Sequence, residues 1–205
     1  MRASLRVLFF VLLLGVTACG PRAQTAIWEE SFDAVGAWQL SSDAAAETRI
    51  EDGRLLIVVH EPGQVAWAVT GKQFSNLRLA VEATPIAGPV DNEYGILVRM
   101  DGDQHFYAFS ISADGYARAA RYADGQWTLL SADWFPHAAI AQGMATNRLE
   151  LEAQGAQFSF WVNGELVVEL SDAELTQGDV GFYAGAFNEG AVQVAFDNLR
   201  IEPLP

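Results

Sequence analysis

One stretch, residues 157–170, constrains most strongly what this chain can fold into. It contains two apolar runs of strand length on either side of Asn163-Gly164, and Asn-Gly in this setting is the strongest short-range signal for a β-hairpin. The apolar residues alternate along both runs: Phe158, Phe160 and Val162 in the first, Leu166, Val168 and Leu170 in the second. A two-residue turn would put these two sets on opposite faces. A three-residue loop with a G1 bulge at Gly164 pairs Trp161 with Glu165 and returns both sets to one face, and we predict this form.

Turn dipeptides divide the rest of the chain into short runs. Besides Asn163-Gly164 they are Asp52-Gly53, Asp101-Gly102, Asp114-Gly115 and Asp124-Gly125. The runs between them alternate or are wholly apolar, as strands do: 54–59, 65–70, 77–83, 94–100, 105–112, 116–122, 126–130, 148–153, 180–184 and 192–201. About a dozen short strands without a helical period predict an all-β sandwich of two antiparallel sheets.

The chain is acidic, with 26 Asp and Glu against 12 Lys and Arg, and its net charge is −14. Nucleic acids and anionic lipid surfaces are both negative, so this balance argues against either as an electrostatic partner. From residue 27 onward the chain has the length of one domain, roughly 180 residues, which buries about 70% of its unfolded surface. The sequence therefore predicts a single soluble domain with a sizeable core.

The first 18 residues have the pattern of a secretory signal peptide. Arg2 and Arg6 supply positive charge before an apolar run from Val7 to Val16. That run of ten residues is too short to cross a bilayer as a helix, which needs about 20. We expect the chain to be exported and residues 1–18 to be removed.

The signal ends in Val16-Thr17-Ala18-Cys19, which resembles the lipobox of bacterial lipoproteins. The resemblance implies a diacylglyceryl group on Cys19, cleavage before it and acylation of the new amine. The alternative is ordinary cleavage after Ala18, because Val16 and Ala18 also suit a small-residue site. Cys19 is the only cysteine, so no internal disulfide can form. Residues 19–26 would then be the lipidated cysteine with a short linker, anchored in the outer face of the plasma membrane or in the outer membrane.

The order of motifs from residue 53 to residue 202 carries a second resemblance. The segment YGILVRMDGDQHFYAFSISADGYARAARYADGQWTLL is followed by NRLELEAQGAQFSFWVNGELV, VGFYAG and VAFDNLRIE. This order is similar to the laminin-G-like and concanavalin A-like jelly rolls of bacterial surface lipoproteins. It is particularly similar to their 3-keto-disaccharide hydrolase-like and family-16-glycosidase-like branch. The resemblance implies a jelly-roll domain over residues 27–205 and, as an activity, hydrolysis of modified disaccharides.

No catalytic motif supports that activity. Glycoside hydrolysis uses two carboxylates beside the bond that breaks, and the sequence lacks the Glu-x-Asp-x-x-Glu strand of the family-16 enzymes. His60, His105 and His137 are isolated, without metal-ligand spacing, and no Gly-x-Ser-x-Gly elbow occurs. The sequence therefore favours binding over catalysis, with an enzyme as the alternative.

Parity divides the strands 105–112, 116–122 and 126–130 into two faces. With three-residue turns ending at Gly115 and Gly125, the core face carries Tyr107, Phe109, Ile111, Ala117, Ala119, Trp127 and Leu129. The opposite face carries Phe106, Ser110, Tyr116, Arg118, Tyr122, Gln126 and Thr128, and a two-residue turn at Asp101-Gly102 adds Leu97 and Arg99.

Rings interleaved with guanidinium and hydroxyl groups can stack on a sugar and hydrogen-bond it. We therefore predict a ligand platform walled at one end by the loop 131–143. Its residues are Arg99, Phe106, Tyr116, Arg118 and Tyr122, with Trp134 on the loop. The alternative is a solvated outer face with incidental rings.

One metal site follows from the resemblance alone. In jelly rolls of this kind an Asp on the last strand often ligates a structural Ca²⁺, which implies this role for Asp197. Ca²⁺ takes six to eight oxygen ligands, and backbone oxygens near residues 29–31 and 52–53 could supply them. The alternative is an Asp that hydrogen-bonds locally. We expect no cofactor beyond this possible structural Ca²⁺.

Together these observations predict a lipid-anchored, extracytoplasmic module that binds a glycan and performs no chemistry on it. The bilayer is its partner through Cys19, and nucleic acid is not a partner. Two alternatives stay open: a hydrolase on modified disaccharides, and an adaptor that binds another surface protein.

The anchor can be tested directly. Changing Cys19→Ala removes the thiol that would carry the acyl chains, so the variant is expected to move from the detergent phase to the aqueous phase or to stay unprocessed. Wild-type phase partitioning of the variant would contradict lipidation.

Overall fold

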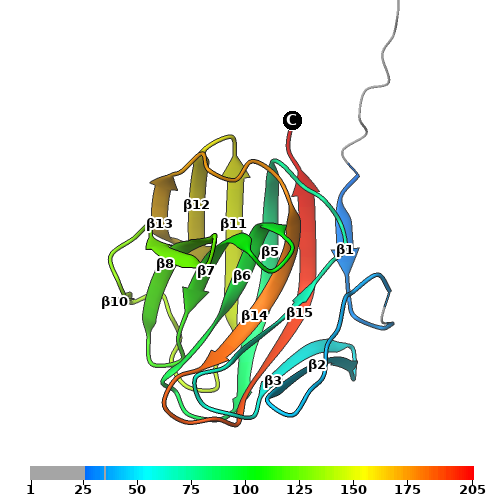
Figure 1. The fold of residues 1–205 in the computed structure, drawn as a ribbon, viewed down its shortest axis with the longest axis vertical. Coiled ribbons are helices and arrows are strands. Elements are labelled where there is room, and N and C mark those ends of the chain that lie inside the picture. Colours follow the sequence, from blue (N-terminus) through cyan, green and yellow to red (C-terminus); the bar gives the residue numbers. More distant parts are fainter. Residues whose placement is uncertain (1–25, 35) are drawn as a thin grey trace, which may run out of the picture.

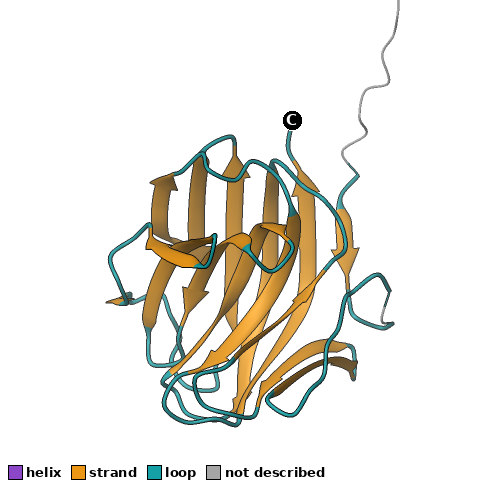
Figure 2. Ribbon diagram, viewed as in Figure 1, coloured by secondary structure: helices purple, strands orange, loops and turns teal. Residues whose placement is uncertain are grey.

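The computed structural model describes residues 26–34 and 36–205, which form fifteen strands and no helix (Figure 2). The predicted signal peptide, residues 1–18, and Cys19 lie outside the described residues. Within the described ranges, no helix is long and apolar enough to span a membrane. The strands are β1 (Trp28–Glu30), β2 (Ala46–Glu51), β3 (Arg54–Val59), β4 (Val65–Val69), β5 (Leu77–Ala87), β6 (Asn92–Asp101), β7 (His105–Ile111), β8 (Tyr116–Ala123), β9 (Gln126–Leu129), β10 (Phe135–Pro136), β11 (Asn147–Gln154), β12 (Gln157–Val162), β13 (Glu165–Ser171), β14 (Asp179–Ala186) and β15 (Val192–Pro203).

The strands form two antiparallel sheets that pack face to face (Figure 1). The eight-stranded sheet has the order β13-β12-β11-β5-β15-β3-β2, with β1 also paired to β15. The seven-stranded sheet has the order β10-β8-β7-β6-β14-β4, with β9 also paired to β8. Neighbouring strands are often distant in sequence, as in β5 beside β15 and β6 beside β14. This is the predicted all-β jelly-roll sandwich; the strands β1, β2 and β10 were not expected.

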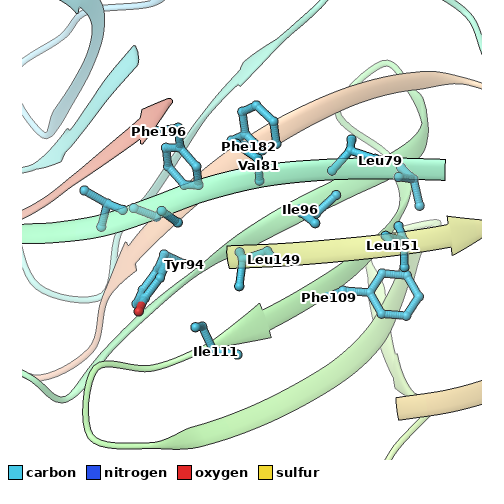
Figure 3. Close-up of a cluster of buried hydrophobic side chains, with 14 of the residues drawn as sticks. Leu79, Val81, Tyr94, Ile96, Phe109, Ile111, Leu149, Leu151, Phe182 and Phe196 are labelled. Atoms are coloured by element: carbon cyan, nitrogen blue, oxygen red, sulfur yellow. The ribbon is translucent and has the colours of Figure 1, made fainter. Parts of the chain in front are cut away.

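The core lies between the sheets and consists of the inward residues of each strand (Figure 3). Leu79 and Leu151 on the eight-stranded sheet face Ile96 and Phe109 on the other, and all four are fully buried. Aromatic pairs join the sheets: Phe182 stacks on Phe196 with ring centroids 4.9 Å apart, and Tyr107 meets Phe158 at 4.6 Å. Because the strands other than β9 contribute inward residues to this layer, their remaining residues are left for the two outer faces.

The hairpin of β12 and β13 has a bulge, but not where we predicted it. Val162 pairs with Glu165 and Trp161 with Leu166, so Asn163-Gly164 is a two-residue turn. Both turn residues have positive φ, 53° and 84°, as a type I′ turn requires. The register shifts one step later, because Phe160 pairs with Val168 and leaves Val167 as the extra residue. The bulge still restores the apolar face from Val168 onward, whereas Leu166 points outward and is exposed.

The turn at Asp124-Gly125 also differs from the prediction. Ala123 pairs with Gln126, so this is a two-residue turn rather than a three-residue one, and both of its residues have positive φ. The shift of one residue moves Trp127 and Leu129 from the core face to the outer face, where they are 51% and 48% exposed. The prediction of both as core residues was therefore wrong. The turn ending at Gly115 has the predicted three residues, since Ser112 faces Tyr116.

Arg99 does not lie on the outer face, contrary to the prediction. A register shift between Val98 and Asp101 and a φ of 53° at Arg99 interrupt the alternation of β6. The side chain is 3% exposed and its guanidinium carbon lies 4.7 Å from the ring centre of Phe158. Its Nη atoms donate to backbone carbonyls of three separate loops: Ser75 at 3.1 Å, Gly155 at 2.6 Å and Leu175 at 2.7 Å. Arg99 therefore holds loops together at one end of the sandwich.

Tyr107, Asp172 and Arg121 make a second polar link near the same end. The Tyr107 hydroxyl donates to Asp172 Oδ1 at 2.6 Å, and Arg121 Nη1 donates to Oδ2 at 2.5 Å. Burial pushes the pKa of Asp172 upward, but these donors and the Glu174 amide outweigh it, so the pKa is lowered overall. The carboxylate is thus ionised at neutral pH and ties the loop after β13 to β7 and β8.

The assignment of faces can be tested with one pair of variants. Phe109→Ala removes a fully buried ring that packs on Phe158 and Phe160, so we expect unfolding to become easier by about 3 kcal/mol or more. Tyr116→Ala on the outer face, where the side chain is exposed, should cost less than about 1 kcal/mol. Denaturant melts compare the two, and a larger loss for Tyr116→Ala would mean that the faces are exchanged.

Candidate functional site

A groove of about 420 Å³ lies on the outer face of the seven-stranded sheet. Residues from β4, β6, β7, β8, β9 and β14 line it, together with the loops before β4 and after β14. The aromatic lining residues are Trp67, Phe106, Trp127, Tyr183 and Phe187. The polar ones are Gln64, Glu93, Arg118 and Asn188, and the others are Gly63, Val65, Leu97, Gly185 and Ala186. The groove is therefore largely aromatic, with a few polar groups on its floor.

Three lining residues, Glu93, Arg118 and Tyr183, form one hydrogen-bonded cluster on the floor of the groove. Arg118 Nη2 lies 3.0 Å from Oε1 and 2.9 Å from Oε2 of Glu93, and the Tyr183 hydroxyl donates to Oε1 at 2.6 Å. The Glu93 and Tyr183 side chains are almost fully buried. Burial, and then the negative charge of Glu93, raise the pKa of Tyr183 well above its ordinary value, so its hydroxyl stays protonated and donates. The cluster is joined by hydrogen bonds throughout, and its one negative side chain is balanced by one positive side chain.

Aromatic rings form one wall of the groove. Phe106 stacks on Tyr122 with centroids 5.3 Å apart, and Trp127 meets Phe106 edge-on at 5.6 Å. Trp127 also lies 5.1 Å from Tyr122. The two-residue turn at Asp124-Gly125 makes this cluster possible, because it places Trp127 opposite Tyr122 on the same face. Half of the Trp127 surface remains exposed to solvent.

Arg118 lies between two tryptophans. Its guanidinium carbon is 5.7 Å from the ring centre of Trp127 and 4.7 Å from that of Trp134. Both contacts are within the range of cation–π attraction. Trp134, on the loop before β10, in turn meets Phe187 edge-on at 5.7 Å. One guanidinium thus positions aromatic residues from β9 and from the loop.

A second hollow of about 190 Å³ adjoins the groove, with which it shares the lining residue Phe187. Its lining residues are Asp91, Ser112, Asp114, Tyr116, Trp134 and Phe187. Tyr116 is 38% exposed and presents its ring here rather than in the larger groove.

The structure brings most of the predicted platform together. Phe106, Arg118 and Tyr122 share the outer face with Leu97, and Phe106 and Arg118 line the groove. Tyr116 and Trp134 border the adjoining hollow. Arg99 is the exception, because its bulge turns it into the sandwich. What these residues bind stays a prediction.

Sequence reasoning missed the centre of the groove. Glu93 directly precedes the inward residue Tyr94, and Tyr183 directly follows the inward residue Phe182. Period-2 alternation alone would therefore have placed Glu93 and Tyr183 on the outer face. The signal was masked because VGFYAG is wholly apolar apart from the Tyr hydroxyl, and a run of that kind reads as buried on both faces. Trp67 and Phe187 gave no such signal, since neither lies in a strand with clear alternation.

The predicted calcium site lies elsewhere, at the pairing of β1 with β15. Asp197 sits at a bulge of β15, and its Oδ1 accepts the Asn198 amide at 2.7 Å. Residues 29–31 run beside β15, and a Cβ atom built at Gly53 would lie 3.7 Å from the Ser31 carbonyl oxygen. The segments named as ligand donors therefore do gather at this edge. In the described part of the chain, no three His, Cys, Asp or Glu side chains are placed to hold a metal, so backbone oxygens would have to dominate, and calcium stays a prediction.

Comparison with known proteins identifies the family. Residues 27–202 match the 3-keto-alpha-glucoside-1,2-lyase-like domain, and the chain belongs to this family. A search of curated proteins finds no match.

Solved structures share the fold at low sequence identity. The carbohydrate-binding module CBM66 from Bacillus subtilis is similar with a TM-score of 0.66 and 14% identity over 81% of this chain and 95% of its own. The β-glucanase of Bacillus licheniformis has a TM-score of 0.65 and 11% identity, over 89% of this chain and 100% of its own. The Crh5 transglycosylase, solved in complex with NAG, has a TM-score of 0.63 and 12% identity, over 88% and 86% of the two chains. These likenesses show the concanavalin A-like jelly roll.

Calcium is testable by chelation. If Asp197 ligates a structural ion, EDTA should lower the melting temperature of the wild type and leave Asp197→Ala unchanged, because only the wild type has an ion to lose. An equal melting temperature of the wild type with and without chelator would contradict a structural Ca²⁺ at this site.

The cluster of Glu93, Arg118 and Tyr183 leads to a testable expectation about the stability of the fold. Glu93→Gln keeps the shape but leaves the Arg118 charge without its counterion, so unfolding should become easier by about 2 kcal/mol or more. The double variant Glu93→Gln, Arg118→Met should regain part of this loss, because no unpaired charge is left in the cluster. A single variant that melts like the wild type would show that the pair is not what holds the floor together.

Proposed function

We propose that this chain binds a glycan in the groove on the outer face of the seven-stranded sheet and performs no chemistry on it. The observation that carries the proposal is the pairing of exposed aromatic rings with a hydrogen-bonded polar cluster in one open groove. Its volume of about 420 Å³ is within the range of small-molecule sites, roughly 300–1,000 Å³. Family membership and the fold shared with a carbohydrate-binding module support the same ligand class.

The groove has the two kinds of group that a sugar needs. Trp127, which is half exposed, and Trp67, which is partly exposed, offer flat apolar surface for the C–H faces of a pyranose ring. Glu93 and Arg118 offer fixed partners for hydroxyl groups: both bonds from Arg118 to Glu93 use Nη2, which leaves Nη1 as a donor for a ligand. Because Tyr183 and Arg118 already fix Glu93, little ordering is needed when a ligand binds.

A second candidate is chemistry on a modified disaccharide. The family name points to it, and so does a carboxylate at the groove floor. Elimination from a 3-keto glycoside needs a base that takes the proton at C2, beside the ketone, while the C1–O bond breaks and a C=C bond forms. Arg118 and Tyr183 both donate to Glu93, so neither of its carboxylate oxygens is free of a hydrogen-bond donor before a substrate arrives. Among the groove-lining residues Glu93 is the one carboxylate, whereas hydrolysis through an acid and a second carboxylate needs two.

One assay distinguishes glycan binding from chemistry on a modified disaccharide. Incubation of the full-length protein with a 3-keto-disaccharide should leave the substrate intact if the groove only binds. Release of a free sugar that Glu93→Gln abolishes would establish the enzyme instead.

We also propose that the domain acts outside the cytoplasmic membrane, held there by the acylated Cys19. The support is the sequence pattern around Cys19, and residues 19–26 would keep the groove close to the bilayer, since eight extended residues reach at most about 29 Å. A glycan of the cell envelope, or one arriving from outside, would then be within reach.

Binding is tested by a glycan array with the full-length protein in detergent. Wild-type protein should bind at least one class of oligosaccharide, and Trp127→Ala should weaken that binding at least about tenfold, because it removes exposed stacking surface without opening the core. Trp161→Ala is the matched control, since Trp161 pairs with Glu150 and Leu166 on the outer face of the other sheet. Equal loss in both variants, or binding untouched by Trp127→Ala, would contradict the assigned groove.

A further inference from the structure

We propose that the groove and the adjoining hollow are two consecutive subsites for one neutral oligosaccharide. The ligand would then span at least two sugar residues and carry no carboxylate. This inference rests on the proposed glycan binding and adds the length and the charge class of the ligand.

The two hollows are parts of one continuous surface. Phe187 lines both of them, and Trp134 touches it edge-on with ring centroids 5.7 Å apart. Trp134 lines the smaller hollow but stacks on Arg118, whose guanidinium lines the larger one. Phe187, with Trp134 against it, therefore lies where the two concave spaces meet, and a chain of sugar rings can extend from one space into the other.

The smaller hollow repeats the chemistry of the larger one. Tyr116 and Trp134 give it aromatic surface, of which Tyr116 is 38% exposed. Ser112, Asp114 and Asp91 give it hydroxyl and carboxylate oxygens, which accept hydrogen bonds from sugar hydroxyls. The Ser112 hydroxyl donates to Asp114, so this part of the rim is ordered before any ligand arrives.

The charges of both hollows select against an acidic sugar. In the larger groove the single positive group, Arg118, is neutralised by Glu93 within 3.0 Å. The sequence suggested a positive platform of two arginines, but Arg99 lies inside the sandwich. In the smaller hollow Asp91 and Asp114 face no cation among the lining residues. A uronate would therefore meet unpaired negative charge in one subsite and no free positive charge in the other.

The experiment measures binding as a function of ligand length and charge. The probes are neutral gluco-, galacto- and manno-oligosaccharides of one to six residues and oligogalacturonates of the same lengths, titrated by calorimetry into the full-length protein in detergent. We expect affinity to rise from one to at least two residues in the neutral series and the uronates to bind at least about tenfold more weakly. Uronates that bind as tightly as the neutral series would overturn the charge class.

Three variants locate the effect. Tyr116→Ala should cost about tenfold for the longer neutral probes and leave the shortest binding probe unchanged, whereas Trp127→Ala should weaken all of them. Asp91→Asn should reduce the discrimination against uronates, because it removes one negative charge from the smaller hollow. A Tyr116→Ala effect that is equal at every length, or absent, would overturn the second subsite, provided that the melting temperatures match the wild type.

Failure of this inference is distinguishable from failure of the proposed function. If no probe binds the wild type, neither the inference nor glycan binding survives. If neutral probes bind through Trp127 with the same affinity at every length, glycan binding stands and only the second subsite is lost.

Discussion

Burial of one face of each paired strand other than β9 between the two sheets is the constraint on which the rest of the structure depends. The rings of Phe109, Phe158 and Phe182 fill this layer and fix which residues of each strand point inward. In the seven-stranded sheet, the residues that alternate with these inward ones on β6, β7, β8 and β14 therefore point to the outer face. The groove is made from those residues, so packing in the core decides which side chains can meet a ligand.

Turn length controls this allocation, and here sequence reasoning reached its limit. Alternation and turn dipeptides were enough to predict the sandwich, most strand positions and the inward direction of Phe109. They could not distinguish two-residue from three-residue turns at Asp124-Gly125, and a difference of one residue moved Trp127 from the core to the groove. A bulge with the same effect took Arg99 away from the predicted platform. Bulges and turns are settled by contacts across the sheet that a local pattern does not contain.

The centre of the site was hidden for a different physical reason. Glu93 and Tyr183 are almost fully buried although they lie on the outer face, because Arg118 and the surrounding rings cover them. A charged residue in a strand normally indicates a solvated face. Only the sheet order β8-β7-β6-β14 shows that Arg118 on β8, Glu93 on β6 and Tyr183 on β14 combine into one neutral cluster. That neutrality is the reason why the ligand proposed above is an uncharged sugar held by stacking and hydroxyl contacts.

The crystal structure of the protein with a bound neutral oligosaccharide tests the central claim most directly. The account predicts sugar density against Trp127 and Trp67, with hydroxyl groups within hydrogen-bond distance of Arg118 or Glu93. Density on the outer face of the eight-stranded sheet, or at the edge where β1 meets β15, with the groove left open to solvent, would contradict it.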